Sequence, residues 1–267
     1  MYEGLALTAA SLLTAAGNLA THYPRIKSNH APLRPRREQS VMVLTLLLAG
    51  GGFLLQPGIA GYLLGGAAIL LALLFLLGTA TSGLPEKKPA VTVGAIAPDF
   101  TATDADGHEF RLSDLRGRTV LMKFYRGYWC PYCVGELEQL NSFASDFEKI
   151  GVMLVAVSSD RVDELQPFAR KHKWRIQLIA DPTLAIHRLY NVQSRKFSPK
   201  RGPFRDLAIP TTILIDKEGR VLWFEQTTDF RVRPQADMIL AKAKAKALLP
   251  SAASDSAVPD TCDVCAA

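Results

Sequence analysis

Residues 119–137, TVLMKFYRGYWCPYCVGEL, decide the fold of this chain because they place two thiols one helical turn apart directly after an apolar strand. The stretch VLMKFY reads as a buried strand, and the apolar residues after Pro131 recur at helical spacing. Cys130 therefore lies where a helix begins, and the free amide donors and positive dipole end of that helix favour a thiolate, the nucleophilic form. The pattern predicts thiol redox chemistry at Cys130 and Cys133. Because Cys-x-x-Cys is also metal-ligand spacing, half of a zinc site is the alternative.

Side chains next to the pair are candidates for supporting roles. Arg126 is close enough in sequence to lower a cysteine pKa, and the same holds for Lys123. A solvated surface charge is the alternative for both, and Lys123, which alternates with apolar neighbours, is expected to point outward. Trp129 and Tyr132 are expected to wall the site, with simple packing as the alternative.

The apolar residues are concentrated near the start of the chain, where residues 1–83 are predicted to form a membrane anchor. Residues 58–80 contain no charge and would cover about 35 Å as a helix, enough to span a bilayer. Residues 41–56 are uncharged but shorter, and a Gln-Pro-Gly turn separates the two segments. Residues 4–20 are a possible third span. A cleaved signal peptide is disfavoured because the start of the chain lacks a basic segment.

A basic segment at residues 25–37 predicts the orientation of the anchor. Positive loops stay in the cytoplasm, so two crossings after this segment would return the chain to the cytoplasmic side. A single crossing at 58–80 would instead place the rest of the chain outside or in the periplasm. The net charge of +6 is concentrated in part beside these spans, and no nucleic-acid motif accompanies it, so we expect a lipid membrane and no nucleic acid as partner.

After a linker at residues 84–91, residues 92–249 alternate strand and helix patterns, which predicts one α/β domain with a central mixed sheet flanked by helices. The expected strands and helices follow from apolar periodicity. We expect strands at 109–112, 119–125, 152–157, 176–179, 211–215 and 221–225, and helices at 131–150, 161–173, 184–190 and 234–249. Asp216–Gly219 is predicted to be the hairpin turn between the last two strands.

Several motifs of this domain recur together in one family. They are GAIAPDF at 94–100, WCPYC at 129–133, VAVSSD at 155–160, ADP at 180–182 and AIPTTILID at 208–216. With them the chain resembles the peroxiredoxin-like AhpC/TSA branch of the thioredoxin superfamily from Val93 to about Leu248. The resemblance implies a thioredoxin-like fold and thiol-based reduction of hydroperoxides or disulfides, with a thioredoxin- or glutathione-type electron donor and no cofactor or metal. It also implies that Pro210 is a cis-proline packed against the cysteine pair.

The chain departs from this family at the pair itself. Peroxiredoxins carry a threonine three residues before the attacking cysteine and a glutamate three residues after it, which maps the attacking cysteine onto Cys133 and the glutamate onto Glu136. Cys130 then replaces the threonine, and Pro210 stands where the family carries an arginine. The thioredoxin pattern instead makes Cys130 attack and Cys133 resolve, and would place a buried acid near Phe124.

Both templates end in a disulfide between the two cysteines, so which thiol attacks first stays open. We predict a membrane-anchored, thiol-dependent antioxidant oxidoreductase that reduces hydroperoxides, with protein-disulfide reduction as the alternative. A metal-binding module that adds a histidine, His187 or His108, to the pair is a second alternative. A third alternative is an interaction domain without redox activity, but in such a domain the two thiols of the WCPYC motif would have no chemical role.

Residues 250–267 are predicted to be a flexible tail that carries a second pair, Cys262 and Cys265. About 12 residues separate this pair from the last helix, which gives a typical reach of about 20 Å. The second pair is therefore a possible electron relay to the first. An inert tail and a metal-binding tail are the alternatives.

Overall fold

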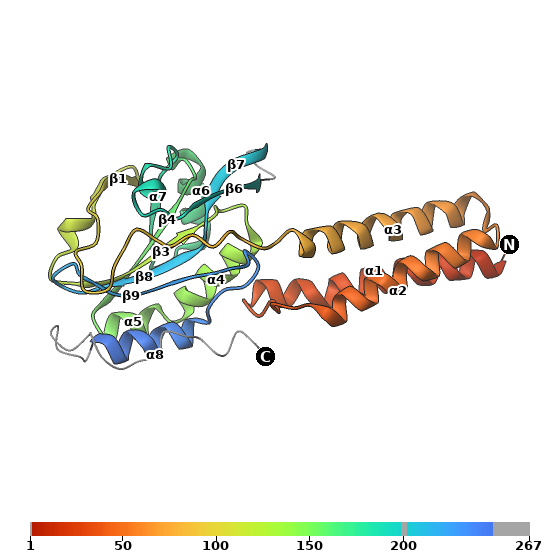
Figure 1. The fold of residues 1–267 in the computed structure, drawn as a ribbon, viewed down its shortest axis with the longest axis horizontal. Helices are drawn as coiled ribbons and strands as arrows, with labels where there is room; N and C mark the ends of the chain where they lie inside the picture. Colours follow the sequence, from red (N-terminus) through yellow and green to blue (C-terminus); the bar gives the residue numbers. More distant parts are fainter. Residues whose placement is uncertain (1, 199–201, 248–267) are drawn as a thin grey trace. The chain divides into compact units, whose positions relative to one another are not determined.

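The computed structural model describes residues 2–198 and 202–247 (Figure 1). The chain divides into two compact units, Met1–Gly83 and Leu84–Ala267. The first unit is all helical and the second is built on a sheet, so each has its own hydrophobic core.

The first unit packs three helices, α1 (Tyr2–Lys27), α2 (Arg36–Leu54) and α3 (Gly58–Ala80), against one another. The helices approach closely at small residues: a Cβ atom added at Gly52 would lie 2.7 Å from Thr8 Cγ2. Large apolar side chains face outward instead, including Leu47, Leu54, Ile59, Leu63 and Leu74. By length and composition, α1 and α3 are able to cross a membrane.

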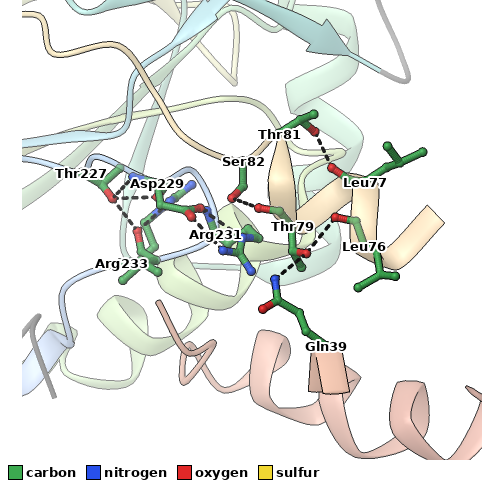
Figure 2. Close-up of polar contacts among 11 residues, drawn as sticks. Gln39, Leu76, Leu77, Thr79, Thr81, Ser82, Thr227, Asp229, Arg231 and Arg233 are labelled. Carbon is green, nitrogen blue, oxygen red and sulfur yellow. Dashed lines mark hydrogen bonds and ion pairs between the residues drawn. The ribbon is translucent and has the colours of Figure 1, made fainter. Parts of the chain in front are cut away.

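Polar side chains between the helices of this unit are paired with one another. Arg25 and Glu38 form an ion pair of 2.5 Å, and the Asn18 amide donates to the Glu38 carbonyl oxygen at 3.0 Å. The Gln39 amide donates to the Thr79 hydroxyl at 3.1 Å, as Figure 2 shows. These contacts join α1 to α2 and α2 to α3 through polar groups, which is how helices in an apolar environment satisfy such side chains.

The second unit contains a mixed seven-stranded sheet in the order β2-β1-β5-β4-β3-β8-β9. Strands β3, β4 and β5 are parallel, and the remaining pairings are antiparallel. The predicted α/β fold with a central mixed sheet is thereby confirmed. The strands are β1 (Thr101–Asp104), β2 (Glu109–Arg111), β3 (Thr119–Tyr125), β4 (Val152–Ser158), β5 (Gln177–Ala180), β8 (Thr211–Ile215) and β9 (Val221–Gln226).

Helices cover both faces of this sheet. One apolar cluster joins one face to α4 (Pro131–Ser142), α5 (Ala144–Lys149), α6 (Val162–His172) and α8 (Ala236–Ala247), and Figure 1 shows α4, α5 and α8 together on that face. A second cluster joins the other face to α7 (Ala185–Leu189). Side chains of a strand alternate between faces, so Leu121 and Tyr125 of β3 enter the first cluster, whereas Met122 and Phe124 enter the second. A short 3₁₀ helix, η1 (Leu112–Leu115), follows β2.

Three features of the second unit differ from the sequence expectations. The helix expected at 131–150 is two helices that meet at Phe143, where neither glycine nor proline marks the break. Strand β1 and the separate hairpin of β6 (Gln193–Ser198) and β7 (Gly202–Ala208) were not predicted, because polar and charged residues interrupt their alternation.

The predicted cis-proline is wrong, because the described residues contain no cis peptide bond and Pro210 is trans. The trans form is the lower in energy for an X-Pro bond. Its flanking backbone groups are also paired in this conformation: Ile209 N–H donates to Val192 at 2.7 Å, and the Pro210 carbonyl accepts from Thr227 N–H at 3.1 Å. Nothing in the local hydrogen bonding therefore requires the cis form.

Candidate functional site

The cysteine pair lies at the start of α4, at the end of β3. Cys130 is the residue that caps the helix, Pro131 occupies the first helical position, and Cys133 lies in the first turn. Both cysteines are free thiols, with 2% and 0% of their surfaces exposed. The position of Cys130 at the helix start is as predicted from the sequence, and the structure buries both sulfurs.

The guanidinium group of Arg233, which is distant in sequence, lies beside the cysteine pair. Arg233, in the segment between β9 and α8, donates from Nη2 to Cys133 Sγ at 3.4 Å, and its Nε lies 3.0 Å from Glu136 Oε2. Its side chain is fully buried. Sequence reasoning sought this arginine at Pro210 and missed it. The available signal was the unusual run of two arginines, Arg231 and Arg233, just before the last helix.

Glu136 joins Arg233 to a second buried cation. Lys123 Nζ lies 2.6 Å from Glu136 Oε1 and donates to the Thr212 hydroxyl at 2.9 Å. Lys123 was expected to point outward, but the alternation of β3 turns it toward α4 together with Leu121 and Tyr125, and it is 2% exposed. The carboxylate of Glu136 alone balances only one of these two cations.

These contacts act differently on the pKa values of the two thiols. Burial alone would raise the pKa of Cys133, but the hydrogen bond with Cys130, the charge of Arg233 and a bond from the Arg126 backbone together lower that pKa well below the ordinary thiol value. The hydrogen bond to Cys133 and burial raise the pKa of Cys130 instead. These directions favour the thiolate on Cys133, with Cys130 as the thiol bonded to it. Burial also raises the pKa of Glu136, against the opposing charges of Lys123 and Arg233.

Arg126 is buried rather than solvated, with 4% of its surface exposed. Its guanidinium lies 4.3 Å from the ring centre of Phe230 and 5.4 Å from that of Trp129. Tyr132 packs edge-on against Phe230 with ring centres 6.1 Å apart. Trp129 and Tyr132 thus lie beside the pair as expected, and both are half-buried.

A buried carboxylate holds the loop that precedes the pair. Asp160, fully buried, accepts from Tyr128 N–H at 2.8 Å and from the Ser158 hydroxyl at 2.9 Å. Gly127 has φ +147°, and a Cβ atom there would lie 2.7 Å from Asp160 Oδ1. The sequence analysis named Asp160 only as part of a family motif and did not predict that it positions this loop.

The remaining candidates lie elsewhere. Pro210 is buried next to β8. His187 is fully buried on the other face of the sheet, where its Nδ1 lies 2.7 Å from Asp181 and its ring packs against Phe124. His108 belongs to a turn with Asp104 and Asp106, the one group with metal-ligand geometry among the described residues. The second predicted pair, Cys262 and Cys265, lies outside the described residues.

Comparisons with known proteins agree with this arrangement. The chain is 37% identical over 156 residues to the thiol-disulfide oxidoreductase ResA of Geobacillus kaustophilus, which covers 58% of this chain and 81% of that protein. ResA of Geobacillus thermodenitrificans is 35% identical over 155 residues, which cover 57% and 80% of the two chains. The crystal structure of Enterococcus faecalis AhpC has the same fold, with a TM-score of 0.53 at 17% identity over 63% of this chain and 99% of that one.

These similarities establish the class of chemistry predicted from the cysteine pair, that of a thiol-dependent oxidoreductase. The pattern of the AhpC/TSA family matches residues 93–224, a segment that contains both cysteines and ends before Arg233. The chain belongs to the AhpC/TSA family.

Proposed function

We propose that the second unit reduces hydroperoxides, with Cys133 as the attacking thiolate and Cys130 as the resolving thiol. The observation that carries this proposal is the contact of Arg233 with Cys133 at 3.4 Å. It supplies the cation that the sequence lacks at Pro210 and directs it to the sulfur that the peroxiredoxin template makes the nucleophile. A guanidinium in a buried site stabilises a thiolate and also the negative charge that develops on a departing peroxide oxygen.

The cycle has two balanced steps. The Cys133 thiolate attacks the terminal oxygen of ROOH, the O–O bond breaks, and a proton from solvent completes the alcohol ROH, leaving a sulfenic acid. The Cys130 sulfur then displaces the hydroxyl group, which leaves as water with the Cys130 proton, and the disulfide forms. A thioredoxin- or glutathione-type dithiol or thiol pair returns two electrons and two protons. The proximity of the two thiols favours disulfide formation over further oxidation.

Burial of both sulfurs favours a small oxidant. A protein disulfide must bring its own sulfur into line with the attacking thiolate, which requires an exposed nucleophile. Cys133 has no exposed surface, and Cys130 has 2%. A hydroperoxide of nearly the size of water needs a much smaller opening.

We infer that the first unit spans a membrane and holds the redox unit on the cytoplasmic side. The outward leucines of α2 and α3, several of them more than half exposed, would be costly in water and favourable in lipid. Three crossings place the basic segment 25–37 inside and return the chain inside after α3, where Lys87 and Lys88 follow. This topology agrees with the charge distribution at both cytoplasmic ends.

Protein-disulfide reduction is the second candidate function. Its support is that relatives at 35–37% identity, aligned over 80% or more of their length, are named thiol-disulfide oxidoreductases. In that reaction Cys130, at the helix start, would attack the substrate disulfide and Cys133 would resolve.

A trapping experiment separates the two functions. The full chain in detergent, as the Cys130→Ser variant, is treated with one equivalent of hydrogen peroxide and then with dimedone, which labels sulfenic acids. We expect a dimedone adduct on Cys133 by mass spectrometry and slow reduction of insulin disulfides by the unmodified chain. Fast insulin reduction without any adduct would assign the second function instead.

A further inference from the structure

A groove lies at the end of the sheet where β3 and β4 begin. Its volume is about 480 Å³, and buried apolar residues of α5 and β4, among them Ala144 and Leu154, line it. The cysteine pair lies at the other end of β3, after Tyr125. Because β3 has seven residues and a strand rises about 3.3 Å per residue, the groove and the pair are about 20 Å apart along the sheet. The groove is therefore separate from the redox site.

Cations at this groove outnumber the acids that pair with them. Arg118, Arg175 and Lys217 line the groove together with one acid, Glu148, and all four residues are exposed. Arg175 Nη1 lies 3.0 Å from Glu148 Oε2, so these two charges neutralise each other. The side chains of Arg118 and Lys217 have no hydrogen bond or ion pair with any residue that the structure describes. A concave site that keeps two positive charges beside an apolar surface favours an acidic ligand that also carries apolar groups.

The last described helix leads toward this groove. In α8, Lys242 Nζ lies 4.8 Å from the ring centre of Trp223, near the beginning of β9. A hydrogen bond with Lys149 chiefly lowers the pKa of Asp146 in α5, and the charge of Lys244 in α8 lowers this pKa further. Lys244 is therefore close to α5, which lines the groove, and α8 ends within one turn after it. Figure 1 shows α8 beside α5.

The chain that continues from α8 has the composition that the groove favours. The tail, residues 250–267, contains Asp255, Asp260 and Asp263, two valines in the same stretch, and neither lysine nor arginine. An extended chain covers up to about 3.5 Å per residue, so Asp255 can lie as far as about 28 Å from the end of α8. The groove, which begins at α5, is within that reach.

We propose that the tail docks in this groove, where Arg118 and Lys217 pair with its aspartates. The tail is joined to the unit that it binds, which gives it an effective local concentration of about millimolar order, so a few exposed ion pairs are sufficient. Docking holds Cys262, which lies between two of the aspartates in the sequence, at the end of the sheet opposite the first cysteine pair. The two cysteine pairs are thus kept apart. The inference is independent of the oxidant and of which cysteine attacks first.

A zero-length cross-linker tests this contact in the full chain. The protein in detergent is treated with a water-soluble carbodiimide, which joins a lysine amine directly to a carboxylate, and the monomer band of a denaturing gel is digested for mass spectrometry. We expect a link from Lys217 to Asp255, Asp260 or Asp263, and an at least about tenfold loss of it in 1 M sodium chloride, where the screening length is about 3 Å. A link that occurs only in the dimer band would assign the groove to the tail of a second copy and overturn the proposal.

Proteolysis tests the same contact without a cross-linker. The double variant Arg118→Gln with Lys217→Gln removes both unpaired cations. Arg170→Gln with Lys171→Gln, at exposed residues of α6, removes the same charge elsewhere and is the matched control. We expect proteinase K to cut the tail at least about tenfold faster in the first variant than in the parent protein, and at the parent rate in the control.

A neutral tail provides the complementary change. The triple variant Asp255→Asn, Asp260→Asn and Asp263→Asn should raise the cleavage rate as much as the double variant at Arg118 and Lys217, and the two sets of changes together should raise it no further. Equal cleavage rates in the parent protein and in both variants would overturn the proposal. Neither readout involves a peroxide or a disulfide, so failure of the docking is distinct from failure of the proposed function.

Discussion

Arg233 Nη2 lies 3.4 Å from Cys133 Sγ, although 100 positions separate the two residues in the chain. The contact favours a negative charge on the second cysteine of the pair, with the first cysteine as its hydrogen-bond partner. This order is the reverse of the one expected from the helix start alone. A specific cation thus outweighs the general effect of the helix dipole, which is worth less than a paired charge in a buried site.

Removing the guanidinium should weaken the thiolate. For Arg233→Gln we expect the pKa of Cys133 to rise, because an opposite charge within about 4–6 Å lowers a pKa by about 1–3 units. At pH 7 the rate of iodoacetamide alkylation at Cys133 should fall at least about tenfold, and the pH profile should move to higher pH. Arg161→Gln, at an exposed arginine, is the matched control and should leave the profile in place. An unchanged profile in Arg233→Gln would mean that another group holds the thiolate.

The lowered pKa of Cys133 also affects stability. Its folded-state pKa lies below the ordinary thiol value of 9.0, so the thiolate stabilises the reduced fold fully above pH 9 and this contribution disappears as pH falls through the lowered value. We therefore expect the difference in urea midpoint between the reduced parent protein and Cys133→Ser to grow as pH rises across that window. A difference that shrinks with rising pH would contradict the assignment of the charge.

Among the charged residues around the cysteine pair, neutralising Glu136 should lower the free energy of unfolding the most. Glu136→Gln leaves Lys123 and Arg233 with only the thiolate between them, and the loss of one partner from a buried ion pair costs about 3–5 kcal/mol. Denaturant unfolding of the reduced protein measures this change. The double variant Glu136→Gln with Lys123→Met should recover part of the loss, because it removes the extra cation. Full additivity of the two changes would show that the charges are not coupled.

Gly127 should be required for the loop before the pair. Its φ of +147° is unfavourable for other residues, and a methyl group there would lie 2.4 Å from Trp129 Nε1 and 2.7 Å from Asp160 Oδ1, so Gly127→Ala should lower the free energy of unfolding by about 1–3 kcal/mol. Gly107→Ala is the matched control, since Gly107 also has positive φ but has open space around it. Equal costs for the two variants would leave backbone strain as the whole effect and remove any role for the contacts with Trp129 and Asp160.

Reporter fusions test the membrane topology. Fusions after residues 38 and 88 should report the cytoplasm and a fusion after residue 57 the opposite side, because the proposed topology has α1, α2 and α3 each cross the membrane. A fusion after residue 88 that reports the outside would place the redox unit there and overturn the proposed localisation.

The parts of the structure that the sequence predicted are those with strong local periodicity. β3 and the start of α4 were predicted because an apolar strand, a proline and a regular helical pattern follow one another, and α3 was predicted because its residues are uniformly apolar. The buried position of Lys123 was available from its alternation with Leu121 and Tyr125, but its charge argued for solvent. Only the position of Glu136 one turn after Cys133 explains why that charge is buried.

The role of Arg233 could not be assigned from local patterns. Arg231 and Arg233 mark a basic segment before the last helix, but the contact that gives Arg233 its role spans 100 positions. β6 and β7 were not predicted because charged residues interrupt the apolar alternation by which a strand is recognised, and their antiparallel pairing appears only in the structure.

The most direct test of the central claim is the second-order rate constant for hydrogen peroxide with the fully reduced full-length chain, followed by Trp129 fluorescence and thiol titration. We expect a rate at least about 100-fold above that of free cysteine, the scale of effect expected from aligned electrostatic donors, and its loss in Cys133→Ser but not in Cys130→Ser. A rate no higher than that of free cysteine, or one that depends on Cys130 and not on Cys133, would contradict the assignment of Cys133 as the peroxide-reactive thiolate.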